Sequence, residues 1–197
     1  VAALAARVES HAGVGDRHAL VAQVRPERLP LSLAQQRMWF LNRFEAGASE
    51  ATGGRRESAV NNIPVAIRLT GALDVDALQA AVADVVGRHE SLRTVYPTVN
   101  GVPTHRVLGS VEVPVRVIDA SDVEVGSGPP TDRPEVHSAL TDLGERPRDL
   151  AEGPVVRACI VHLAADRHVV GVAVHHIAAD GESVAPLTGD LMQAYAT

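Results

Sequence analysis

The sequence predicts an α/β fold, an α+β sandwich in which helices cover a mixed, mostly antiparallel sheet. The strongest observation is a pair of apolar runs, 155–163 and 168–176, which read as an antiparallel hairpin turning at 165–166. Helical patterns occur on both sides of this hairpin without alternating strictly with single strands. No Gly-x-Gly-x-x-Gly motif occurs, so a dinucleotide-binding fold is not expected.

The amino-terminal part is expected to contain two helical pieces joined by a linker. Residues 1–9 form a short Ala-rich helical piece, and residues 10–30, with several glycines and prolines, read as the linker. The first strong helix start is Ser32, where Gln35 completes a capping box, and the helix continues to Phe44.

The next segment is expected to leave this helix, form a strand and enter a second helix. Residues 46–59 are rich in Gly, Ser, Ala and Glu and read as a flexible excursion. Residues 63–69 alternate as a strand. Asp74 is the expected cap of the following helix. The apolar stripe of that helix is Leu78, Ala81, Val82, Val85 and His89.

The middle of the chain is expected to add a hairpin, a strand and a polar helix. The hairpin joins residues 91–96 to 103–108 and turns at an Asn-Gly pair at 100–101. A strand follows at 113–118, and a polar helix runs from about 134 to 145 after an acidic loop. The chain ends on a helix with an inward stripe of Val184, Leu187, Leu191 and Tyr195.

Composition and charge restrict the class of protein. At 197 residues the chain suffices for one sizeable domain or one lobe of a larger enzyme. Its net charge of −6 argues against nucleic acid or an anionic membrane as main partner. Its single cysteine, Cys159, forms no internal disulfide and reads as a buried small hydrophobe. No bilayer-spanning stretch or leader is visible, so a soluble cytoplasmic protein is expected.

Two adjacent histidines, His175 and His176, form the strongest candidate site. They follow an apolar strand and precede Ile-Ala-Ala-Asp-Gly at 177–181. Because side chains alternate along a strand, one ring is expected to enter a solvent channel while the other hydrogen-bonds inside the fold. An imidazole there suits proton transfer near neutral pH. Metal binding is not expected, since the two rings diverge; the alternative is two satisfied core histidines.

Three motifs in order resemble the first three signature motifs of condensation domains, which form peptide bonds in nonribosomal peptide synthetases. They are Ser-Leu-Ala-Gln-Gln-Arg-Met-Trp at 32–39, Arg-His-Glu-Ser-Leu-Arg-Thr at 88–94 and His-His-Ile-Ala-Ala-Asp-Gly at 175–181. The resemblance covers about residues 28–197. It implies a fold like chloramphenicol acetyltransferase, with two such lobes forming a tunnel, of which this chain matches the amino-terminal lobe.

The resemblance also implies a domain organisation and partners. Residues 1–9 resemble the tail helix of an upstream carrier domain, 10–30 the linker, and 31–197 the amino-terminal lobe. The implied partners are upstream and downstream peptidyl carrier proteins, the absent carboxy-terminal lobe and an adjacent adenylation domain. The carrier's Gly-Gly-x-Ser motif is absent, so no cofactor is expected to attach covalently; substrates arrive as phosphopantetheine thioesters. Without the second lobe, the chain alone is expected to be inactive.

The resemblance assigns the chemistry to two residues. His176 either takes a proton from the attacking ammonium or holds the amine and steadies the tetrahedral intermediate, and the sequence leaves both roles open. Gly181 fits a tight turn and is expected to present its backbone N–H to the developing oxyanion.

Four residues are expected to support this site. His175 is the internal histidine of the pair. Asp180 is expected to pair with Arg88, with Arg93 the second candidate, and so to hold the turn that bears the histidines. The alternative for the two arginines is a solvated helix end and a strand-edge charge. Since losing one partner of a buried pair costs about 3–5 kcal/mol, Asp180→Ala is expected to misfold more than it slows chemistry.

Two other functions stay open at this stage. The lobe is either a non-catalytic module that docks a carrier protein, or a stand-alone acyltransferase acting on acyl-CoA. Glu182 stands where many members of the family carry Trp, which implies an altered choice of donor.

Overall fold

The computed structural model describes residues 21, 24–26, 29–52, 60–121 and 133–197. The expected carrier tail at 1–9 and most of the expected linker lie outside these residues. Within them, no helix is both long and apolar enough to cross a membrane.

A four-stranded sheet in the order β1-β8-β7-β6 forms the centre of the molecule. Its strands are β1 (Asn62–Thr70), β6 (Val115–Asp119), β7 (Val156–Ala164) and β8 (Arg167–His175). β8 pairs antiparallel with both β1 and β7, whereas β6 and β7 are parallel. The expected mixed, mostly antiparallel sheet is therefore confirmed.

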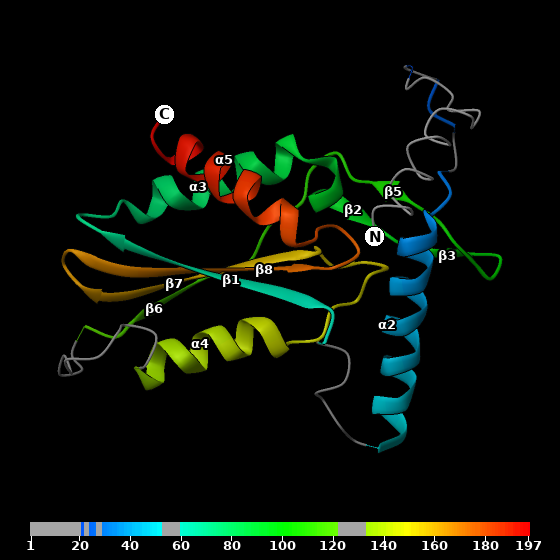
Figure 1. Ribbon diagram of the computed structural model, residues 1–197, viewed down its shortest axis with the longest axis horizontal. Coiled ribbons are helices and arrows are strands. Elements are labelled where there is room, and N and C mark those ends of the chain that lie inside the picture. The colour runs from blue at the N-terminus through cyan, green and yellow to red at the C-terminus, as the bar shows by residue number, and fades with distance from the viewer. Residues whose placement is uncertain (1–20, 22–23, 27–28, 53–59, 122–132) are drawn as a thin grey trace, which may run out of the picture.

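Helices cover both faces of this sheet. They are α2 (Leu33–Thr52), α3 (Val75–Arg88), α4 (Pro134–Glu145) and α5 (Val184–Tyr195), with 3₁₀ turns η2 (Glu90–Arg93) and η4 (Gly181–Ser183). Figure 1 shows α3 and α5 on one face, α4 on the other, and α2 standing beside the sheet. Two short ribbons pair β2 (Thr94–Val95) with β5 (Arg106–Val107), and β3 (Thr98–Val99) with β4 (Val102–Pro103).

Strand β8 divides the core into two layers by its alternation. Val170, Val172 and Val174 pack in the cluster under α3 and α5. Val169 and Ala173 pack in the cluster under α4. A strand buried on both faces reads as a continuous apolar run, as the sequence does here, so β8 delivers the His pair from the centre of the domain.

The local signals that start and turn the elements are confirmed. Ser32 Oγ accepts from the Gln35 backbone N–H at 3.2 Å, and Gln35 Oε1 accepts from the Ser32 backbone N–H at 3.0 Å, forming the expected capping box. The Asp74 carboxylate caps α3 by accepting from the Ala77 N–H at 3.0 Å. Asn100 turns the ribbon with a positive φ of 53°.

Two boundaries differ from the sequence prediction. The segment 46–59 was expected to be a flexible excursion, but residues 46–52 belong to α2, which ends at Thr52; residues 53–59 lie outside the described part of the chain. The Ala and Glu residues of 46–52 are strong helix formers, and they outweigh the single Gly47. The second difference is at 91–93, which belongs to the 3₁₀ turn η2 instead of the expected strand.

The described residues of the expected linker contact the domain. The Arg25 guanidinium forms an ion pair with Glu90, with Nη2 to Oε2 at 2.7 Å. Leu29 forms a β-bridge with His105. The chain is therefore tied to the domain before α2 begins.

Candidate functional site

The two histidines at the end of β8 lie in opposite surroundings. His175 is the last residue of the strand and is fully buried. His176 follows it and is exposed. The expectation that one ring stays inside the fold while the other reaches solvent is therefore confirmed.

His175 is held neutral inside the fold. Its Nδ1 accepts a hydrogen bond from the Ile177 backbone N–H at 3.1 Å, so the ring proton is on Nε2. Burial lowers its pKa from 6.5 to about 4, and the charges of Arg148 and His176 add to this shift. The ring therefore stabilises the turn and takes no part in proton transfer at neutral pH.

One ring nitrogen of the exposed His176 is fixed by a backbone carbonyl. Its Nδ1 lies 2.8 Å from the carbonyl oxygen of Ala179. A carbonyl only accepts hydrogen bonds, so Nδ1 carries the proton and Nε2 carries the lone pair. Its backbone N–H donates to the Asn61 carbonyl at 2.7 Å. A ring with a fixed tautomer and an exposed basic nitrogen suits general base catalysis.

Asp180 supports the turn as a helix cap. Its Oδ1 accepts from the Ser183 backbone N–H at 3.1 Å and from Ser183 Oγ at 2.7 Å. Ser183 Oγ in turn accepts from the Asp180 backbone N–H at 3.1 Å, which completes a capping box. These bonds hold the pKa of the Asp180 carboxyl below its usual range.

The expected pairing of Asp180 with Arg88 or Arg93 is wrong. Arg88, at the end of α3, has its Nε 3.8 Å from Asp190 Oδ2. Arg93 has its Nη2 3.6 Å from Glu90 Oε1 and also donates to the Leu108 carbonyl. The reason is geometric: α3 packs against α5, so Asp190 on α5 meets Arg88 while Asp180 stays exposed.

Gly181 begins the 3₁₀ turn η4. Its φ is not in the left-handed region, and among the described residues a Cβ at this position meets no atom within 4 Å. Neither the backbone conformation nor packing against those residues therefore requires glycine there. An approaching substrate would still need open space beside the Gly181 backbone, which the absence of a side chain provides.

The structure brings the three sequence motifs together around the His-bearing turn. Ile177 packs in one cluster with Trp39 and Met38 of α2, so Trp39 serves helix packing. A hollow of about 320 Å³ lies against Ala178 and is also lined by His89. Residues from all three motifs thus lie around the turn, sharing a hydrophobic cluster or a hollow with it.

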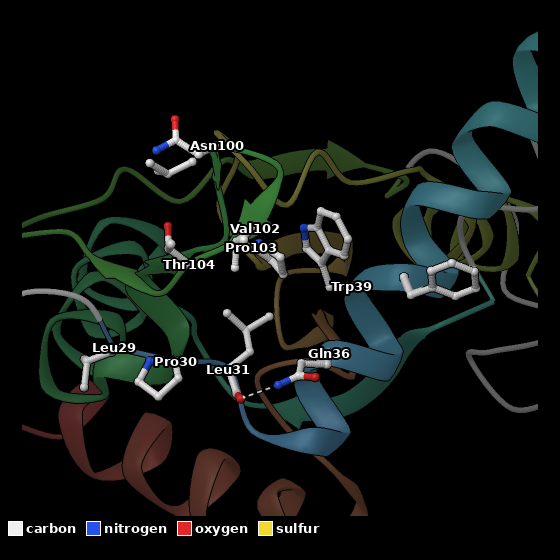
Figure 2. Close-up of a pocket in the computed structure, with 11 residues that line it drawn as sticks. Leu29, Pro30, Leu31, Gln36, Trp39, Asn100, Val102, Pro103 and Thr104 are labelled. Carbon is white, nitrogen blue, oxygen red and sulfur yellow. Dashed lines mark hydrogen bonds between the residues drawn. The ribbon is translucent and has the colours of Figure 1, made fainter.

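A larger groove of about 650 Å³ lies between α2 and the β3–β4 ribbon. Figure 2 shows Trp39 beside Val102 and Pro103 at this groove, with Gln36 hydrogen-bonded to the Leu31 carbonyl at 3.0 Å. None of the predicted site residues lines it. The groove therefore lies apart from the predicted site.

Sequence reasoning missed two residues behind the turn. Arg148, in the loop after α4, is buried, and its Nε donates to Asn62 Oδ1 at 2.9 Å. Asn62 pairs with His175 in the β1–β8 register. The only signal in the sequence is an Arg between Pro147 and Asp149 in a loop, which ordinarily indicates a solvated charge.

The fold is that of a chloramphenicol-acetyltransferase-like lobe, and the His-His-x-x-x-Asp-Gly turn lies at the end of its strand β8. A family model described as the condensation domain matches residues 26–197. The chain therefore belongs to the condensation-domain family.

The chain is similar to parts of several synthetases. It is 44% identical over 178 residues to the isonitrile lipopeptide synthase of Mycobacterium tuberculosis, covering 90% of this chain and 6% of that protein. It is 38% identical over 180 residues to a dimodular nonribosomal peptide synthase of Bacillus subtilis, covering 90% of this chain and 7% of that protein. It thus spans a small part of these relatives.

Solved structures show the same fold. The X-domain from teicoplanin biosynthesis matches with a TM-score of 0.73 and 34% identity, over 90% of this chain and 34% of that one. The SgcC5 protein of Streptomyces globisporus matches with a TM-score of 0.67 and 30% identity, over 85% and 36%. The described lobe corresponds to about a third of each.

Proposed function

We propose that this chain is the His-bearing part of a domain that forms a peptide bond between two thioester-bound substrates. The observation that carries this proposal is the exposed Nε2 of His176, whose ring is oriented by the bond from Nδ1 to the Ala179 carbonyl. Membership of a condensation family supports the reaction class.

The proposed reaction is the attack of an acceptor amine on a donor thioester carbonyl. The N–C bond forms, the C–S bond breaks, and the growing chain moves to the acceptor. His176 Nε2 takes the proton from the attacking nitrogen and returns it to the departing thiolate, so protons balance over the cycle. The backbone N–H of Gly181 is the proposed donor to the oxyanion of the tetrahedral intermediate.

Carrier proteins are the proposed partners of this site. They deliver donor and acceptor as phosphopantetheine thioesters, with an adenylation domain loading the acceptor. Because the chain covers about a third of its solved neighbours, the remaining lobe is proposed to supply the second wall of the substrate channel. The 197-residue chain alone is then expected to be inactive.

The test is condensation between two loaded carrier proteins by the complete domain that contains this chain. His176→Ala should lower the rate by about 10²–10⁴-fold, the range for loss of a general base. His137→Ala is the matched control, since His137 is an exposed histidine on α4. Equal rates for wild type and His176→Ala would reject the proposal.

A second candidate function is a binding module that docks a protein partner without turnover. One solved neighbour, 35% identical to this chain, is the X-domain of teicoplanin biosynthesis in complex with OxyB. Binding of a loaded carrier without product, for wild type and His176→Ala alike, would favour the module. Product from free acyl-CoA would instead indicate a stand-alone acyltransferase.

A further inference from the structure

Arg148 is a buried cation bound to neutral acceptors. Arg148 is only 3% exposed. Besides Asn62 Oδ1, it donates to the Ala173 carbonyl at 2.7 Å and to the Pro154 carbonyl at 3.4 Å. Among the described residues it makes no ion pair with a carboxylate.

Packing alone does not account for an arginine here. Burying a cation has a desolvation cost, and an apolar side chain of similar volume fills such a site without that cost. The burial is strong enough to lower the Arg148 pKa to about 9, with the nearby Arg157 adding to the shift. The group is still charged at neutral pH, so its hydrogen bonds persist.

The acceptors of Arg148 adjoin the groups that hold the two histidines. The His175 backbone N–H donates to the Val155 carbonyl at 2.8 Å, and Arg148 binds the preceding residue, Pro154. The His176 backbone N–H donates to the Asn61 carbonyl at 2.7 Å, and Arg148 binds the following residue, Asn62. The guanidinium thus joins β1 to the segment just before β7, on either side of the end of β8.

We propose that Arg148 is a positioning residue for His176, joining the segments on either side of β8 so that the turn directs the His176 ring outward. This inference rests on the proposed function, in which His176 is the reacting group. Arg148 does not touch the substrate; it acts through Asn62 and the carbonyls of Pro154 and Ala173.

The charge of Arg148 also favours the observed conformation of the turn. It helps to keep His175 neutral, and a neutral His175 keeps Nδ1 available to accept from the Ile177 N–H. Protonation of Nδ1 would put two N–H donors face to face at that point. The arginine therefore protects the hydrogen bond that begins the turn.

Arg157 provides a matched control for the test. Its guanidinium also donates to carbonyls of the same loop, Arg146 O and Pro147 O, both at 3.1 Å. Among the described residues, its side-chain hydrogen bonds reach neither β1 nor β8. Arg157→Met therefore removes a comparable set of bonds to the loop while leaving the His-bearing turn in place.

The experiment compares Arg148→Met, Arg148→Lys and Arg157→Met with wild type. In the full 197-residue chain, NMR follows exchange of the His175 and His176 backbone amides. In Arg148→Met both amides should exchange about ten-fold or more faster than in Arg157→Met, because the guanidinium no longer joins the segments that carry their acceptor carbonyls. In the complete domain, Arg148→Met should lower kcat by up to about 100-fold with KM unchanged.

Arg148→Lys keeps the charge but loses the forked geometry of the guanidinium. Its amide-exchange rates and its kcat should therefore lie between those of wild type and Arg148→Met. It also provides the test if Arg148→Met does not fold. Amide exchange equal to that of Arg157→Met, or kcat within about two-fold of it, would overturn the inference. If the wild-type domain forms no product, the proposed function fails, and amide exchange alone then supports or overturns the positioning of the turn.

Discussion

The two sides of the end of β8 use the same side chain for opposite purposes. On the inner side, His175 is fully buried, neutral and fixed by the Ile177 N–H. On the outer side, His176 is exposed and fixed by the Ala179 carbonyl. One ring uses Nδ1 as an acceptor and the other uses it as a donor, although one peptide bond separates them.

This difference shows how the backbone assigns roles to identical residues. The strand ends at His175, so the next residue leaves the sheet and enters the turn. Whether Nδ1 accepts or donates is then set by the backbone group that it meets, which is an N–H for His175 and a C=O for His176. The inner histidine should determine stability, and the outer one activity.

The largest expected effect on stability is at the inner side. His175→Ala should destabilise the fold by about 2–5 kcal/mol, as for other large-to-small core substitutions. His176→Ala, at an exposed position, should change stability by about 0.5 kcal/mol or less. Urea unfolding of both variants checks this, and similar losses for the two would remove the distinction between the sides.

The second prediction concerns pH. The folded-state pKa of His175 is about 4, below its ordinary value of 6.5. The unfolded state therefore binds the proton first, and stability that is fully present above pH 6.5 is lost as pH falls to about 4. The loss is up to about 3 kcal/mol by linkage. His175→Gln should reduce this slope, and an unchanged slope would contradict the assignment.

The third prediction concerns the cap on the outer side. Because Asp180 is exposed and caps η4, Asp180→Ala should cost about 1 kcal/mol, the usual value for a lost helix cap. This is smaller than the 3–5 kcal/mol expected for a broken buried pair. Thermal unfolding distinguishes these two values, and a loss of about 3–5 kcal/mol would indicate that Asp180 does have a buried partner.

The smallest expected effect on stability is at Gly181. Since a Cβ there meets no atom, Gly181→Ala should leave the free energy of unfolding within about 0.5 kcal/mol of wild type. In the complete domain the same variant should lower the condensation rate, because the methyl group would occupy space beside the proposed oxyanion. Full activity in Gly181→Ala would remove Gly181 from the site.

The sequence predicted most of the fold, because that fold follows local patterns. The β7–β8 hairpin, the caps at Ser32 and Asp74 and the turn at Asn100 each depend on residues close together in the chain. The end of α2 was missed because loop-like composition did not prevent helix formation. Strand alternation predicted that His175 and His176 lie in different surroundings, but the exposure of His176 also depends on the end of the strand at His175.

The support of the site was not predictable, because it depends on contacts between distant residues. Arg148 and Asn62 lie 86 positions apart, and nothing in either segment indicates the other. The partner of Arg88 could not be predicted either, since Asp180 lies just before α5 and Asp190 lies within it. Because α3 packs against α5, the partner is Asp190.

The most direct test of the proposed role of His176 is the tautomer of its neutral ring, observed by ¹H–¹⁵N NMR. We predict that the proton of the neutral ring is on Nδ1, bonded to the Ala179 carbonyl, and that Nε2 carries the lone pair. A proton on Nε2 instead would contradict it, since the nitrogen proposed to accept the amine proton would already be occupied.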